Sequence, residues 1–313
     1  MDGQFSLSIV VPMYSSEESI VELVERIRSS VGTLDIGEYE IVLVNDASPD
    51  DVLSKVKSEL MDEDLVLVDM MRNFGQGNAT LAGMEISRGE VVVTIDDDLQ
   101  FPPEEIGNLL DELNEGRDVV YGIPVKSEQS FHRTLGSRFI NLVYRHLFGR
   151  KHNRSSFAAI RRPVVDAVTS HSGSAHFLDG LILWYTGRVG TIQVEKAPRR
   201  FGRSGWGIRQ LVRASLDMIT NYSRAPLLLS AWISFSTAFI AMLLGAFYIF
   251  LTITGGRAVP GWASIFVAIS FFSSVQLFTL GIMGEYIARL QINSNKKPKH
   301  LIRSIERGSE DKE

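Results

Sequence analysis

The stretch VVVTIDDDLQFPPEEI, residues 91–106, decides the fold class of this chain. A run of β-branched apolar residues, typical of a buried strand, leads directly into three carboxylates, Asp96, Asp97 and Asp98. Adjacent like charges repel, so packing alone gives no reason to gather them. Two prolines and an acidic turn follow, which suits the start of a helix. The carboxylates are therefore expected at the carboxyl end of a strand, where open α/β sheets place their ligands.

Strand and helix patterns alternate on both sides of this stretch. The expected strands cover residues 7–14, 38–48, 65–71, 90–98 and 118–123. The expected helices between them cover residues 17–31, 50–60, 78–89 and 103–116. This βαβα order predicts an α/β fold whose mainly parallel, Rossmann-like sheet has helices on both faces. We expect the domain to span residues 1–206.

Further candidate site residues stand at the ends of the other expected strands. They are Pro12, Tyr14, Asp46, Ser48, Arg72 and Asn73. Because the carboxyl ends of parallel strands meet at one edge of a sheet, these residues are predicted to converge with Asp96–Asp98 on one site. Gly75 and Gly77 follow the third strand rather than the first, and the third glycine of a dinucleotide fingerprint is missing. They therefore indicate a dinucleotide site only weakly, and a simple turn is the alternative.

The carboxylates at 96–98 are candidates for a metal site. If the chain stays extended, Asp96, Asp98 and Gln100 share a face while Asp97 points away. Such an oxygen cluster suits Mg²⁺ or Mn²⁺ bound jointly with a diphosphate. The alternative is a solvated acidic loop, and the position at a strand end favours the metal site.

Charge is divided unevenly along the chain. Residues 1–120 carry 27 Asp and Glu against 7 Lys and Arg, while residues 121–313 carry 10 against 25, for a formal net charge of −5. A basic half indicates either nucleic acid or an anionic membrane as partner. Uncharged apolar runs at 227–251 and 262–284 favour the membrane, since roughly 20 such residues span a bilayer. Nucleic acid is not expected, and buried core helices are the alternative reading of the two runs.

The charges around the two runs predict a membrane hairpin with both termini in the cytoplasm. Only Arg257 lies in the connector, whereas the flanks carry Arg224, Arg289, Lys296, Lys297 and Lys299. The expected location is the inner (plasma) membrane, with residues 285–313 forming a cytoplasmic tail. The N-terminus lacks the features of a signal peptide, and the absence of Cys excludes disulfides.

Two amphipathic segments accompany the hairpin. Residues 207–226 and 131–150 place apolar side chains at helical spacing beside arginines. Both patterns are typical of helices that lie in the membrane surface, and packing against a protein core is the alternative. Adjacency to the hairpin favours the surface helix for residues 207–226, so membrane lipids are expected partners.

Four motifs in this order carry a resemblance to a known family: VVPMY, VNDAS, RNFGQGNATLAG and DDDLQFPPEEI. Together they resemble the family 2 glycosyltransferases of GT-A fold. RRFGRSGW, the two apolar runs and GEYIAR narrow the resemblance to the polyisoprenyl-phosphate glycosyltransferases. That group includes dolichol-phosphate mannose synthases, bactoprenol glucosyltransferases and undecaprenyl-phosphate formamido-arabinose transferases. The similarity covers nearly the whole chain and does not specify the sugar.

The resemblance implies roles for individual residues. Asp46 would bind the nucleobase together with the backbone around Pro12 and Tyr14. Asp96 and Asp98 would hold the metal and the donor diphosphate, with Gln100 as a further metal ligand. With Asp179 added from its own sequence context, the predicted catalytic set comprises Asp96, Asp98, Arg199 and Asp179. The binding set comprises Pro12, Tyr14, Glu17, Asp46, Arg72, Asn73, Gly75, Asp97, Arg200, Arg203 and Ser204.

Several of these positions depart from the family pattern or allow a second reading. Glu17 takes the place of an acidic residue usual one position earlier, where this chain has Ser16. Arg203 stands where the family usually has Glu, and Ala158 replaces a frequent Arg. Asp179 is either a base, a sugar-hydroxyl acceptor or an ordinary helix cap.

The chemistry explains why such groups are needed. A nucleotide diphosphate leaving group requires neutralisation by a metal, whereas an acceptor phosphate is already ionised and needs a cation to orient it. Arg199, Arg200 and Arg203 precede the first apolar run, and their alternative role is attraction to anionic headgroups.

The predicted activity is inverting transfer from a nucleotide diphosphate sugar, UDP favoured over GDP, to a polyprenyl phosphate. A processive polysaccharide synthase and a non-catalytic membrane scaffold are the alternatives, and a homo-oligomer is possible.

Overall fold

The computed structural model describes residues 6–125, 155–171, 178–198, 225–254, 261–294 and 298–308. The chain divides into two compact units. The first unit comprises residues 1–134, 148–205 and 297–313, and the second comprises residues 135–147 and 206–296. Several expectations therefore lie outside the described residues: the amphipathic segment 131–150, the segment from Arg199 to Arg224 and the connector 255–260.

An eight-stranded sheet forms the centre of the first unit, in the order β7-β5-β6-β4-β1-β2-β3-β8. The strands are β1 Leu7–Met13, β2 Tyr39–Asn45, β3 Leu65–Met70, β4 Val91–Thr94, β5 Val119–Pro124, β6 Ala158–Arg161, β7 Val189–Val194 and β8 Ile302–Arg307. The four central strands, β4, β1, β2 and β3, are parallel to one another. β6 and β8 run antiparallel to their neighbours, and β5 pairs with β7 in parallel. The mainly parallel sheet predicted from the sequence is confirmed.

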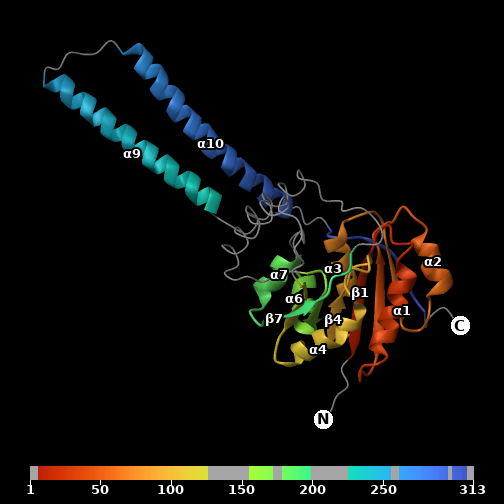
Figure 1. Ribbon diagram of the computed structural model, residues 1–313. Coiled ribbons are helices and arrows are strands. Elements are labelled where there is room, and N and C mark those ends of the chain that lie inside the picture. Colours follow the sequence, from red (N-terminus) through yellow and green to blue (C-terminus); the bar gives the residue numbers. More distant parts are fainter. Residues whose placement is uncertain are drawn as a thin grey trace. The chain divides into compact units, whose positions relative to one another are not determined.

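Helices cover both faces of this sheet (Figure 1). One face packs against α1 Ile20–Val31, α2 Val52–Glu59, the 3-10 turn η1 Pro103–Glu105 and α4 Ile106–Asn114. The other face packs against α3 Gln76–Ile86, α6 Arg162–Thr169 and α7 Leu178–Tyr185. Along β1, Ile9 and Val11 belong to the first core and Val10 to the second, as expected when both faces of a strand are buried.

Helix α3 lies unusually close to the sheet because of Gly83. A Cβ atom at this position would come within 2.4 Å of Val10 Cγ1 and 2.9 Å of Val44 Cγ2. Real Cβ atoms do not approach other atoms so closely, so only glycine fits without displacing the side chains of Val10 on β1 and Val44 on β2. Because α3 follows β3 in the chain, its first residue, Gln76, lies at the carboxyl edge of the sheet.

The end of the chain returns to the first unit. The segment 285–313 was expected to be a tail, but residues Ile302–Arg307 form β8, which pairs antiparallel with β3. Ile302 packs on the core formed with α3 and α6. The segment IRSIER is half charged, so its hydropathy does not reveal a strand, and the pairing depends on β3, more than 200 residues earlier.

The described part of the second unit is a helical hairpin, α9 Ala225–Ile253 and α10 Trp262–Ser294. Leu227–Phe247 and Val267–Ala288 have mean hydropathies of 2.0 and 1.6 and are long enough to cross a membrane. At most 6% of these windows is buried inside the protein, whereas a core helix of a soluble protein is mostly buried. The two helices lie side by side (Figure 1). The Ser234 and Thr279 hydroxyls hydrogen-bond to each other at 2.8 Å. Two apolar helices were therefore predicted correctly, although α10 ends at Ser294 rather than near residue 284.

Candidate active site

The loops that follow the four parallel strands are tied together at the carboxyl edge of the sheet. The Tyr14 N–H, just after β1, donates to Asp97 Oδ2 at 2.9 Å, after β4. The Asp46 N–H, just after β2, donates to the Met13 carbonyl at 3.0 Å. Asp46 in turn accepts N–H groups from the loop after β3. The structure thus brings the strand-end residues expected from the sequence to one place.

The acidic stretch 96–98 is a turn rather than an extended segment. β4 ends at Thr94, and Leu99 has a positive φ of 56°. Asp98 Oδ1 accepts the N–H of Gln100 at 3.1 Å, a side-chain bond to the backbone two residues on that stabilises a tight turn. The expectation that side chains alternate out to Gln100 was wrong, because this turn ends the extended chain.

Asp96 is held from two other parts of the first unit. Its Oδ2 accepts the hydroxyl of Ser156, just before β6, and its Oδ1 accepts the side-chain amide of Gln76, the first residue of α3. Burial raises the pKa of Asp96, and the neighbouring Asp98 charge adds to the rise. The Ser156 hydrogen bond and the positive charge of Lys196 oppose it. A second positive charge close to Asp96 would therefore favour its ionised form.

Asp97 faces the loop after β1. Its carboxylate accepts the Tyr14 N–H. Its backbone carbonyl accepts a hydrogen bond from the Ser19 hydroxyl at 2.6 Å. Burial raises the pKa of Asp97 to about 6, the Tyr14 N–H opposes that rise, and the flanking carboxylates add to it. Its contacts give Asp97 a part in holding the loop after β1 against the acidic turn.

The oxygen atoms of this turn fit a hard divalent cation that is shared with a ligand. Within the described ranges, no group of three or more His, Cys, Asp or Glu side chains is placed to hold a metal ion. Asp96, Asp98 and Gln100 supply two carboxylates and an amide, all half-buried. Mg²⁺ commonly binds through one or two carboxylates and completes its shell with phosphate oxygens and water. The donor set is therefore suitable for a metal bound together with a diphosphate.

Asp46 uses both carboxylate oxygens to hold the loop after β3. Its Oδ1 accepts the Phe74 N–H at 2.7 Å and its Oδ2 accepts the Gly75 N–H at 2.8 Å. Gly75 has a φ of +88°, which favours glycine and turns this N–H toward the carboxylate. Burial of Asp46, which is 2% exposed, raises its pKa, and the two N–H groups oppose the rise. Asp46 therefore fixes the shape of the loop that contains Arg72 and Asn73.

The remaining predicted binding residues in the described ranges line the same edge. Pro12 pairs with Val44 within the sheet, and the Tyr14 side chain is 51% exposed. The Arg72 guanidinium lies over the Phe74 ring, 4.6 Å from its centroid, and Asn73 is exposed. Tyr14, Arg72 and Asn73 are thus the members of the set that are accessible to a ligand.

Glu17 has a different set of contacts. Its N–H donates to Asp50 Oδ2 at 2.9 Å, its Oε2 accepts the Asp51 N–H at 3.3 Å, and its carbonyl accepts Lys55 Nζ at 3.0 Å. These bonds hold the segment before α1 on the start of α2. Through these bonds Glu17 stabilises the loop that begins with Tyr14.

Sequence reasoning missed three residues of the site: Gln76, Ser156 and Lys196. Gln76 lies between the two glycines of FGQG, where only the glycines attracted attention. Ser156 precedes Phe157 in a segment that was considered only for Ala158. Lys196 lies three residues before Arg199, and its Nζ lies 4.7 Å from the Phe101 ring centroid. A polar residue beside a motif is the only signal that could have found them.

Comparison with known proteins identifies the family. A model described as "Glycosyl transferase family 2" matches residues 8–169, slightly more than half of the chain. The chain belongs to glycosyltransferase family 2. The predicted resemblance to this family is confirmed, and the protein is a glycosyltransferase.

Relatives that match this glycosyltransferase over nearly its whole length include proteins named as undecaprenyl-phosphate transferases. An undecaprenyl-phosphate 4-deoxy-4-formamido-L-arabinose transferase of Pseudomonas syringae is 33% identical over 310 residues, covering 97% of this chain and 91% of the relative. An uncharacterized glycosyltransferase of Synechocystis is 33% identical over 306 residues, covering 96% and 95%. Both alignments extend across the two apolar helices as well as the sheet.

Solved structures support the fold alone. A glucosyl-3-phosphoglycerate synthase of Mycobacterium tuberculosis, crystallised with Mn²⁺, UDP and glucosyl-3-phosphoglycerate, gives a TM-score of 0.51 at 17% identity. The match covers 69% of this chain and 78% of that protein. Mannosyl-3-phosphoglycerate synthase of Rubrobacter xylanophilus matches with a TM-score of 0.50 at 17% identity, covering 69% and 72%.

The residues predicted to serve the acceptor are only partly described. Arg199, Arg200, Arg203 and Ser204 lie outside the described residues. The described chain leading to them is tied to the acidic turn, because the Ala197 N–H donates to the Gln100 carbonyl at 2.9 Å. Asp179 lies in the first turn of α7, half-buried, where a carboxylate interacts favourably with the helix dipole. The roles of these residues stay predictions.

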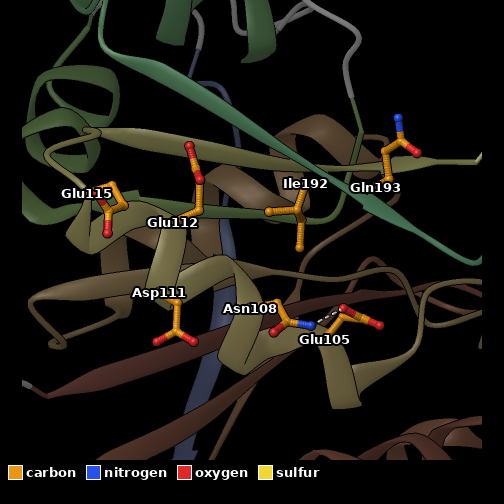
Figure 2. Close-up of a pocket in the computed structure, with 7 residues that line it drawn as sticks. All are labelled: Glu105, Asn108, Asp111, Glu112, Glu115, Ile192 and Gln193. Atoms are coloured by element: carbon orange, nitrogen blue, oxygen red, sulfur yellow. Dashed lines mark hydrogen bonds between the residues drawn. The ribbon is translucent and has the colours of Figure 1, made fainter.

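A surface depression between α4 and β7 is not suited to the donor (Figure 2). Its lining residues are Glu105, Asn108, Asp111, Glu112, Glu115, Ile192 and Gln193. All four ionisable side chains among them are acidic, and they would repel a diphosphate. The Asn108 amide donates to Glu105, as the dashed line in Figure 2 shows. The carboxyl edge of the sheet is therefore the better candidate.

Proposed function

We propose that this glycosyltransferase transfers a sugar, with inversion, from a nucleotide diphosphate sugar to a polyprenyl phosphate at the cytoplasmic face of the membrane. One observation carries the proposal: the acidic turn at the edge of a family 2 sheet occurs in the same chain as two exposed apolar helices. The relatives named as undecaprenyl-phosphate sugar transferases support the acceptor. UDP is favoured over GDP as the donor nucleotide.

The donor is bound at the edge formed by the loops after β1, β2 and β3. Asp46 positions the loop that presents Arg72 and Asn73, and Tyr14 offers an exposed ring for a base. Asp96, Asp98 and Gln100 would hold Mg²⁺ or Mn²⁺. When bound, this ion supplies Lewis-acid neutralisation of the leaving diphosphate. Binding of Mn²⁺ and UDP by the glucosyl-3-phosphoglycerate synthase of similar fold supports this assignment.

The acceptor phosphate needs a cation more than a base. It is ionised at neutral pH, so its oxygen attacks the anomeric carbon while the bond to the diphosphate breaks and the nucleoside diphosphate leaves. Arg199, with Arg200 and Arg203 beside it, would orient the phosphate through the planar fork of the guanidinium. Lys196 supplies a further positive charge near Asp96.

The test is identification of a lipid product. Membranes containing the protein are incubated with polyprenyl phosphate and a panel of UDP- and GDP-sugars, with Mg²⁺ or Mn²⁺ present. We expect one donor to yield a polyprenyl-phosphate monosaccharide that is sensitive to mild acid and absent without the protein. A water-soluble polymer, or no product with any donor, would contradict the proposal.

The order of the elements supports a hairpin that crosses the membrane twice. β3 precedes the two apolar helices in the chain and β8 follows them, yet both strands pair in one sheet. They must therefore lie on the same side of a membrane, which requires an even number of crossings. The basic residues that flank the two helices favour the cytoplasm as that side.

Labelling of single cysteines checks this topology, because the natural chain has no Cys. Ser54 is exposed on α2, and Arg257 lies in the connector. In intact cells we expect a membrane-impermeant thiol reagent to label Arg257→Cys but not Ser54→Cys, and to label both after lysis. Labelling of Ser54→Cys alone in intact cells would reverse the orientation.

A further inference from the structure

The C-terminal strand β8 contacts the loops of the donor site through one arginine. Arg303 Nη1 lies 2.9 Å from Asp69 Oδ2, and Arg303 Nη2 donates to the Met71 carbonyl at 3.3 Å. Asp69 is near the end of β3, and Met71 begins the loop that presents Arg72 and Asn73. Arg303 thus contacts the chain where β3 ends and the loop of the proposed donor site begins.

A β-bulge directs this side chain. Asp69 pairs with Ser304 and Met70 pairs with Ile302, so the register shifts between them and Arg303 is the extra residue. Bulges redirect side chains and are frequent beside active sites. The bulge explains why an otherwise regular edge strand turns an arginine toward a buried carboxylate.

Asp69 also contacts β2. Its second oxygen, Oδ1, accepts the Asn45 side-chain amide at 2.8 Å, and the two residues are register partners. Asp69 and Asn45 are each only 4% exposed. A buried carboxylate is costly unless its oxygens are paired, so the Arg303 and Asn45 contacts together fix the Asp69 side chain.

Asn45 then holds the turn that carries Asp46. Its Oδ1 accepts the Ser48 N–H at 3.0 Å, and Ser48 Oγ accepts the Ser15 N–H at 3.0 Å. Within this turn Ala47 has a positive φ of 49°, a conformation that a non-glycine residue adopts only when its surroundings hold it there. The bonds from Asn45 and Ser48 supply that support.

We propose that Arg303 is a positioning residue for the donor site, acting through Asp69 and Asn45 on the 45–48 turn and through Met71 on the 71–75 loop. The inference rests on the proposed function in taking this edge as the donor site. Seven residues, 295–301, separate Arg303's strand from the end of α10. The segment that returns from the second apolar helix therefore sets the shape of the nucleotide-binding loops.

Arg307 provides a matched control on the same strand. Its Nη1 lies 3.5 Å from Glu40 Oε2, near the start of β2, and both side chains are more buried than that of Arg303. Arg307→Gln therefore removes an arginine–carboxylate pair at the opposite end of β2 from Asn45. We expect it to lower the melting temperature at least as much as Arg303→Gln, with nucleotide affinity unchanged.

The experiment measures nucleotide binding to the full-length protein in detergent with Mn²⁺, using whichever of UDP and GDP the wild type binds more tightly. We expect Arg303→Gln to raise the dissociation constant about tenfold, and Arg303→Lys to raise it less, because Lys keeps the charge but not the fork. In transfer assays the donor KM should rise while the acceptor KM stays unchanged. Asp69→Asn added to Arg303→Gln should give less than the sum of the single effects, as expected for one linked network.

The outcomes separate the inference from the proposed function. An unchanged nucleotide dissociation constant in folded Arg303→Gln and Arg303→Lys would overturn the inference. So would a loss of nucleotide affinity in Arg307→Gln as large as that in Arg303→Gln. If the wild type binds nucleotide but makes no lipid product, the proposed function fails, and the dissociation constants of the variants still decide the inference. Wild-type protein that binds neither nucleotide would overturn both.

Discussion

Asp98→Asn is expected to remove sugar transfer while the protein stays folded. The substitution keeps the size of the side chain and removes one negative charge from the predicted metal site. Metal ions contribute several kcal/mol to stabilising a transition state, so the rate should fall by at least about a hundredfold. The amide oxygen of Asn can still accept the Gln100 N–H, so the turn that Asp98 stabilises is retained. Loss of one of the three neighbouring carboxylates also lowers the electrostatic repulsion within the acidic turn.

The measurement pairs transfer rates with thermal melting, in the presence of Mn²⁺ and in EDTA. Wild-type activity should disappear in EDTA and return with Mn²⁺ or Mg²⁺. Asp111→Asn, the same substitution at the acidic depression on α4, is the matched control and should leave transfer unchanged. Activity in Asp98→Asn that matches the wild type and persists in EDTA would refute the metal assignment.

The acidic turn also illustrates how far the sequence predicts the site. The strand before Asp96 is apolar and β-branched, and its burial follows from local composition, so the position of the carboxylates was predictable. The course of the chain after Thr94 was not. The turn has a positive φ at Leu99 and accepts the Ser19 hydroxyl at the Asp97 carbonyl, and side-chain alternation along an assumed strand reveals neither feature.

Asp46 shows a second limit of the same kind. Its place at the end of β2 was predicted, but both of its oxygens accept backbone N–H groups at positions 74 and 75. Backbone donors carry no sequence signal, so a role in fixing a loop cannot be told from a role in binding a base. Ser156 and β8 were missed for a related reason, since their partners lie 60 and more than 200 residues away.

The second large effect is expected from replacing Arg199, and it concerns the use of the acceptor rather than of the donor. If Arg199 binds the acceptor phosphate, Arg199→Ala should weaken the use of polyprenyl phosphate and leave nucleotide affinity near normal. A charge-assisted hydrogen bond contributes roughly 1.5–3 kcal/mol, so the loss in acceptor efficiency should be at least about tenfold. Arg199→Lys should restore only part of it, because a point charge cannot reproduce the bidentate guanidinium.

Arg200 is the matched control and the close competitor for this role. The two arginines are adjacent, so a shift of one residue in the loop would exchange them. Acceptor kinetics and nucleotide affinity are therefore measured for Arg199→Ala and Arg200→Ala side by side. A loss confined to Arg200→Ala would move the phosphate site by one residue. Normal acceptor kinetics in both variants would mean that these arginines serve only to attract anionic headgroups. The acceptor phosphate would then need another cation, and Lys196, whose positive charge acts on Asp96, is a candidate among the described residues.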